Sequence, residues 1–103
     1  MKKILIAIML CMSAFFMFGM KSNADNTDKI VIVIDPGHGG DNLGAQYNEI
    51  VEKDINLKVA KAMYDRLSMY EGVEVHMTHD TDKGLTLKKR AQIAQKKKAD
   101  YLI

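Results

Sequence analysis

The stretch Ile-Val-Ile-Val-Ile-Asp-Pro-Gly-His-Gly-Gly, residues 30–40, decides the fold of this chain. Its first five residues are all β-branched, too few for a helix and followed by turn formers, which predicts a buried strand over 30–34. Pro36 lacks a backbone N–H and biases Asp35 away from helical geometry, so the strand stops there. Three glycines then leave His38 as the only large side chain of the loop that follows.

The position of His38 predicts a functional loop. In open α/β sheets, ligands bind beyond the carboxyl ends of the strands, and glycines let the backbone approach a bound group closely. A single imidazole on such a loop indicates a metal ligand or a general base, with a solvated or capping histidine as the alternative. A phosphate cradle is disfavoured, because the loop lacks the Lys-Ser/Thr pair that follows a phosphate-binding P-loop.

Downstream of a long loop over 35–51, apolar residues repeat at helical spacing. Ile55, Val59, Met63 and Leu67 lie at four-residue steps and predict an amphipathic helix over 53–70 with these side chains inward. Gly72 stands where a glycine commonly ends a helix.

The rest of the chain alternates strand and helix. Val73, Val75 and Met77 alternate with polar residues and predict a second strand over 73–78. Thr86 is the predicted N-cap for a helix over 87–98, with Leu87 and Ile93 among its inward residues, and residues 101–103 read as the start of a third strand. This order predicts the α/β class, with a mostly parallel twisted sheet flanked by helices.

The first 24 residues read as a secretory signal peptide. A positive start is followed by an uncharged stretch over 4–20 and by the small residues Ser22 and Ala24, which predicts cleavage after Ala24. An uncleaved membrane anchor is the alternative. We therefore expect a secreted or extracytoplasmic protein whose signal segment engages the membrane during export only. Residues 25–29 read as a disordered lead-in, and 30–103 as the folded part.

Composition narrows the class further. The single cysteine, Cys11, lies within the leader, so the exported part must be stabilised by an apolar core or a metal rather than by disulfides. The net charge is +2, three of the lysines lie in the leader region, and no basic stripe is interleaved with aromatic residues. This pattern disfavours nucleic acid as a partner of the chain.

An acidic residue at the end of the long loop is the natural partner for His38. Glu49 and Glu52 are the candidates, and Glu52 lies at the start of the predicted helix, from which it can point toward the loop. Imidazole nitrogen and carboxylate oxygen are normal zinc ligands. The alternative is a carboxylate that favours the positive end of the helix dipole.

With these residues in place, the sequence resembles the zinc-dependent N-acetylmuramoyl-L-alanine amidases, the type 3 family of bacterial cell-wall amidases. The resemblance rests on residues 32–40, Ile-Val-Ile-Asp-Pro-Gly-His-Gly-Gly, on Gly44-Ala45, on Glu52-Lys53-Asp54 and on residues 78–82, Thr-His-Asp-Thr-Asp, and it continues through Leu87 and Arg90 to Ala99-Asp100. It implies that His38 and Glu52 are the first two Zn²⁺ ligands. It also implies peptidoglycan as the substrate, cut by hydrolysis of the amide between N-acetylmuramic acid and L-alanine.

The sequence departs from the family pattern in two side chains. The family usually has an aspartate where this chain has Asn42, and an arginine where it has His79. Neither position is a ligand in the family pattern. We expect His79 to be a strand-end histidine whose polar atoms are satisfied, and His76, on the opposite strand face, to be solvated.

A third departure concerns length. In the family, the strand that begins at Ala99-Asp100 continues into a Ser-Ile-His segment that supplies the second histidine ligand, and a later glutamate is the general base. This chain ends at Ile103. The resemblance therefore implies an N-terminal, truncated portion of the catalytic domain that is inactive alone. The alternative is a non-catalytic wall-binding or inert module.

Overall fold

The computed structural model describes residues 28–103. The predicted signal peptide, residues 1–24, and the first part of the predicted lead-in lie outside the described residues, whereas Asp28 and Lys29 precede the first strand without regular structure. Within 28–103, no helix combines the length and the apolar character needed to cross a membrane.

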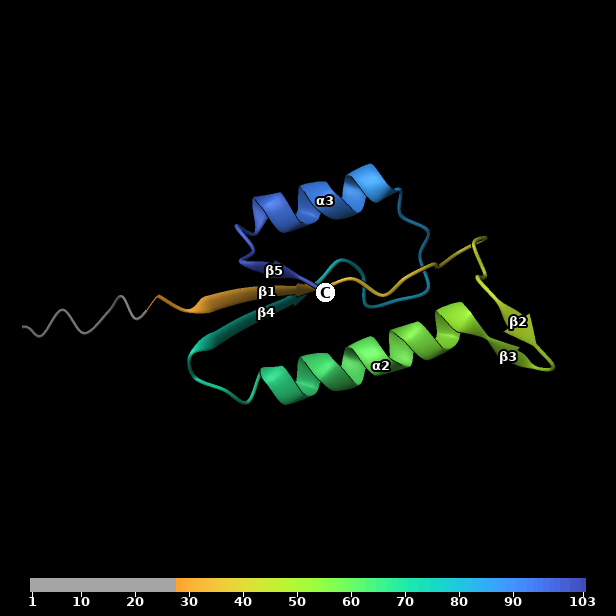
Figure 1. The fold of residues 1–103 in the computed structure, drawn as a ribbon, viewed down its shortest axis with the longest axis horizontal. Helices are drawn as coiled ribbons and strands as arrows, with labels where there is room; N and C mark the ends of the chain where they lie inside the picture. Colours follow the sequence, from red (N-terminus) through yellow and green to blue (C-terminus); the bar gives the residue numbers. More distant parts are fainter. Residues whose placement is uncertain (1–27) are drawn as a thin grey trace, which may run out of the picture.

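Strands and helices alternate along the described chain, with a short extra hairpin between the first strand and the first helix (Figure 1). The elements are β1 (Ile30–Ile34), β2 (Gln46–Tyr47), β3 (Ile50–Val51), α2 (Glu52–Leu67), β4 (Val73–Met77), α3 (Leu87–Lys96) and β5 (Tyr101–Leu102). The predicted α/β order is confirmed, and helices and strands begin and end within a few residues of the predicted positions.

The main sheet is parallel and has the order β4-β1-β5. Strand β1 lies in the centre and pairs along its whole length with β4, from Ile30 opposite Val73 to Ile34 opposite Met77. Figure 1 shows α2 and α3 on opposite sides of these strands. The predicted class, a parallel sheet flanked by helices, is therefore confirmed.

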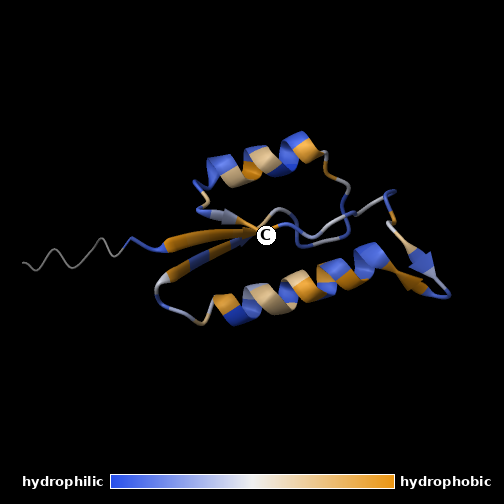
Figure 2. Cartoon of the chain, in the orientation of Figure 1, coloured by the Kyte–Doolittle hydropathy of each residue, from blue (hydrophilic) through white to orange (hydrophobic). Residues whose placement is uncertain are grey.

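The core lies where α2 crosses the sheet. Ile34 of β1, Val75 of β4 and Ala60 of α2 form the buried cluster, and Val33, the neighbour of Ile34 on β1, is buried as well. Figure 2 shows β1 as the most continuously apolar element. Such a continuous run is typical of a central strand covered on both faces.

The inward face of α2 differs from the prediction. Ala60 is buried and Met63 and Leu67 pack against the core, but Ile55 and Val59 are about half exposed. The described sheet covers the C-terminal half of the helix, so the apolar stripe near its N-terminus extends past the strands.

The helix ends also correct the predictions in detail. Helix α2 begins at Glu52, without a side-chain cap, and ends at Leu67 rather than near Gly72. Helix α3 begins after Thr86, whose hydroxyl accepts a hydrogen bond from the Lys89 N–H at 3.1 Å, as predicted for an N-cap. Leu87, expected to point inward, is 85% exposed.

Candidate metal site

The loop after β1 turns through left-handed backbone conformations. His38 has φ 66°, and Gly39 and Gly40 have φ 127° and 58°. A non-glycine residue with positive φ is uncommon and persists only where its surroundings hold it. The backbones of Gly39 and Asn42 hold this turn by exchanging two hydrogen bonds of 2.9 and 3.1 Å.

The structure brings the two predicted ligands together. His38 Nε2 lies 3.3 Å from Glu52 Oε2, and both side chains are partly exposed. Glu49, the other candidate acid, lies in the exposed turn of the β2–β3 hairpin. Between the two glutamates, it is therefore Glu52 that faces His38.

Local structure fixes the carboxylate of Glu52. It is the first residue of α2, and its Oε2 accepts a hydrogen bond of 2.7 Å from the Ala45 N–H. That hydrogen bond lowers the pKa of Glu52 below its ordinary value, the neighbouring His38 adds to the effect, and partial desolvation opposes it. The carboxylate therefore faces His38 in its charged form at neutral pH.

The glycine at position 44 makes room for this pair. Its φ is 68°, and a Cβ placed on it would lie 2.6 Å from Glu52 Oε2 and 2.7 Å from His38 Cδ2. The side chains of His38 and Glu52 thus fill the space that a larger residue at position 44 would need.

The residues present fit a zinc ion. On its other side, the His38 ring has Nδ1 2.9 Å from Asn42 Oδ1, which leaves Nε2 facing the carboxylate. An imidazole nitrogen and a carboxylate oxygen thus face each other 3.3 Å apart, and imidazole with carboxylate is a normal zinc donor set. Within residues 28–103, however, no group of three or more His, Cys, Asp or Glu side chains gathers around one point.

Arg90 holds the backbone of the His38 loop from behind. Its guanidinium donates to Asp35 Oδ1, to the Pro36 carbonyl at 2.7 Å and to the His38 carbonyl at 2.9 Å. The residue is 7% exposed although it belongs to a surface helix. The sequence pointed to Arg90 only as part of the family resemblance, and its contacts with the loop were not predicted. A cation on the inward side of the predicted helix was the signal that could have indicated them.

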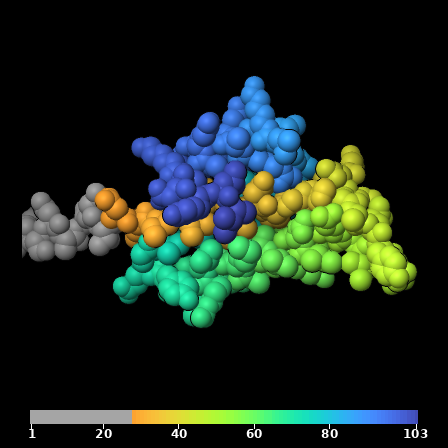
Figure 3. All heavy atoms as spheres, in the orientation of Figure 1, coloured from red at the N-terminus to blue at the C-terminus, as the bar shows by residue number. Residues whose placement is uncertain are grey.

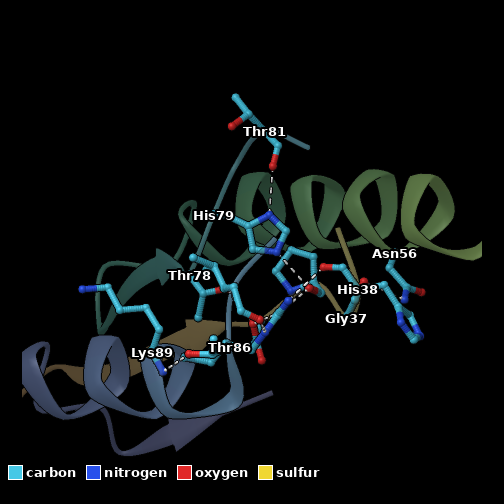
Figure 4. A network of polar contacts seen from close by, with 12 residues as sticks. Gly37, His38, Asn56, Thr78, His79, Thr81, Thr86 and Lys89 are labelled. Carbon is cyan, nitrogen blue, oxygen red and sulfur yellow. Dashed lines mark hydrogen bonds and ion pairs between the residues drawn. The ribbon is translucent and has the colours of Figure 1, made fainter. Parts of the chain in front are cut away.

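His79 supports the same loop. Its ring nitrogens lie 2.9 Å from the Pro36 carbonyl and 2.9 Å from the Thr81 carbonyl, and Figure 4 shows the contact between the His79 ring and Thr81. The prediction of a satisfied strand-end histidine is confirmed. His76, predicted to be solvated, is instead partly buried and pairs with Glu74 at 2.7 Å.

Lys53 and Asp82 fasten the far side of the loop. The Lys53 ammonium contacts the Gly40 carbonyl at 2.9 Å and Asp82 Oδ2 at 2.6 Å, while Asp82 Oδ1 accepts from the Gly40 N–H at 2.7 Å. The hydrogen bond from Lys53, followed by that from Gly40, lowers the pKa of Asp82. The glycine-rich loop is therefore held by hydrogen bonds from the start of α2 and from the segment after β4.

The parallel sheet with its flanking helices makes this an α/β protein, and the histidine–carboxylate pair lies at the carboxyl end of its central strand. The class is therefore an α/β protein with a candidate metal site. Comparison with known proteins identifies the family. The family described as N-acetylmuramoyl-L-alanine amidase matches residues 32–103. The chain therefore belongs to the N-acetylmuramoyl-L-alanine amidase family, as the resemblance predicted.

Individual relatives agree with this assignment. The chain is 36% identical over 75 residues to the N-acetylmuramoyl-L-alanine amidase CwlM of Bacillus licheniformis, covering 72% of this chain and 30% of that protein. It is 37% identical over 76 residues to the amidase AmiC of Escherichia coli, covering 72% of this chain and 18% of that protein. The chain thus spans less than a third of the length of these relatives.

Solved structures share the fold. The crystal structure of the N-acetylmuramoyl-L-alanine amidase from Clostridium difficile 630 superimposes with a TM-score of 0.70 at 35% sequence identity. The match covers 74% of this chain and 42% of that one. The parallel sheet and its flanking helices are therefore part of the amidase fold.

Proposed function

We propose that this chain carries the His38–Glu52 half of a zinc site that serves the hydrolysis of the amide between N-acetylmuramic acid and L-alanine in peptidoglycan. The observation that supports the proposal is the 3.3 Å approach of His38 Nε2 to Glu52 Oε2, in a segment that matches the amidase family. Zinc, when bound, supplies Lewis-acid chemistry that polarises the scissile carbonyl and activates water.

The roles of the chain's own residues follow from their contacts. His38 and Glu52 hold the metal, and the Ala45 N–H keeps the carboxylate of Glu52 aimed at the site. Arg90 and His79 fix the carbonyl groups of the loop that carries His38. A preorganised loop of this kind holds a ligand in place without rearrangement on binding.

A shallow groove beside Glu52 is a candidate substrate surface. It has a volume of about 230 Å³ and is lined by Ala45, Gln46, Tyr47, Ile50, Glu52 and Ile55. Tyr47 is largely exposed on the β2–β3 hairpin. An exposed aromatic ring next to the metal ligands gives a sugar ring or an alanine methyl group an apolar surface to pack on.

Zinc binding tests the site. We expect His38→Ala and Glu52→Ala each to weaken zinc binding, measured by competition with a chromophoric chelator. Loss of an outer-shell partner weakens metal binding about 10–100-fold, and loss of a direct ligand should weaken it more. Glu49→Ala is the matched control, because it removes a carboxylate from the exposed hairpin turn. If His38→Ala and Glu52→Ala bind zinc as tightly as Glu49→Ala, the assignment of His38 and Glu52 as zinc ligands is refuted.

Activity tests the reaction. The described residues gather two ligands, so we propose that this chain alone releases no peptide from purified peptidoglycan. In a chimera where residues 32–103 replace the matched segment of the Bacillus licheniformis relative, we expect zinc-dependent release of peptides with L-alanine at the amino terminus, abolished by His38→Ala. Zinc-dependent release by the 103-residue chain itself would contradict its predicted inactivity.

A non-catalytic wall-binding module is the second candidate, favoured by the same two-ligand arrangement. It predicts saturable binding of the chain to cell-wall sacculi that a chelator does not reduce, and no new amino termini even in the chimera.

For either function we propose an extracytoplasmic location, because peptidoglycan lies outside the cytoplasm. Processing of a fusion of residues 1–24 to a periplasmic reporter tests the leader.

A further inference from the structure

Asn42 contacts the side of the His38 ring that faces away from Glu52. Its Oδ1 lies 2.9 Å from His38 Nδ1 and also accepts a hydrogen bond of 3.3 Å from the Gly44 N–H. Because a backbone N–H can only donate, the amide oxygen rather than the amide nitrogen faces both groups. His38 Nδ1 must then be the protonated nitrogen of the ring.

This assignment decides which nitrogen is free for a metal. A neutral imidazole carries one proton, so a proton on Nδ1 leaves the lone pair on Nε2. Nε2 is the atom that lies 3.3 Å from Glu52 Oε2. The contact with Asn42 thus presents the lone pair of the ring to the carboxylate with which it would share a cation.

The position of Asn42 does not depend on its side chain. Its backbone N–H and carbonyl both bond to Gly39, so the turn closes through main-chain atoms. The side chain is exposed and contributes no buried apolar surface. A substitution at this position therefore removes the side-chain contacts to His38 and to the Gly44 N–H, while the turn keeps its main-chain hydrogen bonds.

We propose that Asn42 is a positioning residue that selects the Nδ1-protonated form of His38 and orients Nε2 for zinc. This inference rests on the proposed zinc site. A neutral amide performs the task without adding negative charge, whereas the aspartate usual in the family would also make the imidazole a more basic ligand.

Zinc affinity of the full chain tests the proposal. We expect Asn42→Ala to bind zinc about 10–100-fold more weakly than the wild type. Asn42→Asp keeps an oxygen acceptor and should bind at least as tightly as the wild type. Gln92→Ala is the matched control and should change nothing, because it removes an exposed amide on α3 whose side chain forms no hydrogen bond within residues 28–103. Circular dichroism should show the same fold for all variants.

Ring protonation gives a readout that a purely structural role would not change. In zinc-free chain labelled with ¹⁵N at histidine, at a pH where the ring is neutral, we expect the His38 proton on Nδ1 in the wild type and in Asn42→Asp. In Asn42→Ala we expect it to move to Nε2, where it can bond to Glu52. A wild-type ring protonated on Nε2 would overturn the proposal.

The two levels of the hypothesis fail differently. If His38→Ala abolishes zinc binding while Asn42→Ala binds as tightly as the wild type, the role of Asn42 is refuted and the zinc site stands. If His38→Ala leaves zinc binding unchanged, the zinc site is refuted and the role of Asn42 with it.

Discussion

At the scale of single residues, Gly44 sets the spacing between the two candidate ligands. Its backbone has φ 68°, and an added Cβ would clash with side-chain atoms of both Glu52 and His38. We expect Gly44→Ala to lower the free energy of unfolding by at least about 1–2 kcal/mol through the left-handed backbone alone. It should also push the ligands apart and abolish zinc binding.

Gly72→Ala is the matched control for that change. Gly72 has no positive φ, and a Cβ there would meet nothing within 4 Å. We expect it to be neutral or slightly stabilising, because alanine restricts the unfolded chain. Urea unfolding followed by circular dichroism checks both variants. Equal effects of the two substitutions would show that Gly44 has no special role.

The proximity of His38 and Glu52 could be predicted from the sequence, because local patterns identify both residues. His38 and Glu52 were located from a glycine-rich loop after a strand and from the start of an amphipathic helix, and the structure places them in contact. The contact between Asn42 and His38 could not be predicted. It depends on the left-handed turn of residues 38–40, whose geometry no spacing in the sequence encodes.

At the scale of elements, Arg90 joins α3 to the loop that leaves β1. It bonds to the carboxylate of Asp35 and to two loop carbonyls, and its side chain is 8% exposed. Removing one partner of a buried ion pair leaves the other charge uncompensated, at a cost of about 3–5 kcal/mol. We expect Arg90→Met to lower the free energy of unfolding by this amount in urea titrations.

An exposed arginine gives the comparison for Arg90. Arg66 lies on the surface of α2, with its guanidinium 5.7 Å from the centre of the Tyr70 ring. An exposed cation–π contact is worth about 0.5–1 kcal/mol, so Arg66→Met should cost no more than that. A loss at Arg90 as small as the loss at Arg66 would mean that the loop is held by other contacts.

The pairing of Lys53 with Asp82 links α2 to the segment after β4 and makes stability depend on pH. Because the pKa of Asp82 is lowered below its ordinary value of 3.8 in the fold, the pairing stabilises fully above pH 3.8 and loses its effect as pH falls through the lower folded value. We expect Asp82→Asn to lower the melting temperature near neutral pH and to converge with the wild type in strong acid.

Asp65→Asn is the control for Asp82. Asp65 is exposed on α2 and forms no ion pair within residues 28–103, so its loss should shift the melting temperature little at any pH. Melting curves by circular dichroism at several pH values give the comparison. A difference between Asp82→Asn and the wild type that stays constant down to strong acid would contradict the linkage.

Element order was predictable from the sequence, but element faces were predictable only in part. A continuous β-branched run located β1, alternation of apolar and polar residues located β4, apolar residues at helical spacing located α2, and the N-cap Thr86 located the start of α3, because each pattern reflects local backbone geometry. The stripe at Ile55 and Val59 was assigned to the core and is half exposed, since burial depends on where the sheet lies. The β2–β3 hairpin was missed, because its strands have two residues each and its turn uses Asn48 with φ 53°.

At the scale of the whole molecule, the described sheet has two edges, β4 and β5, because β1 occupies the centre. Apolar side chains lie on the β5 side, where Leu102 and Ile103 are 47% and 51% exposed. In Figure 3 the C-terminal residues, drawn dark blue, lie on the visible surface. An accessible strand edge with apolar side chains favours pairing with another chain.

We therefore expect the chain to associate as its concentration rises, measured by sedimentation velocity across a dilution series. Leu102→Lys should shift the population toward monomer, because a charge on an edge strand opposes pairing with a second edge. Gln92→Lys adds the same charge to an exposed position on α3, away from the edge, and should associate like the wild type. If both lysine variants dissociate equally, added net charge rather than the β5 edge governs association. If the wild type stays monomeric throughout, the exposed edge is protected by its own short length.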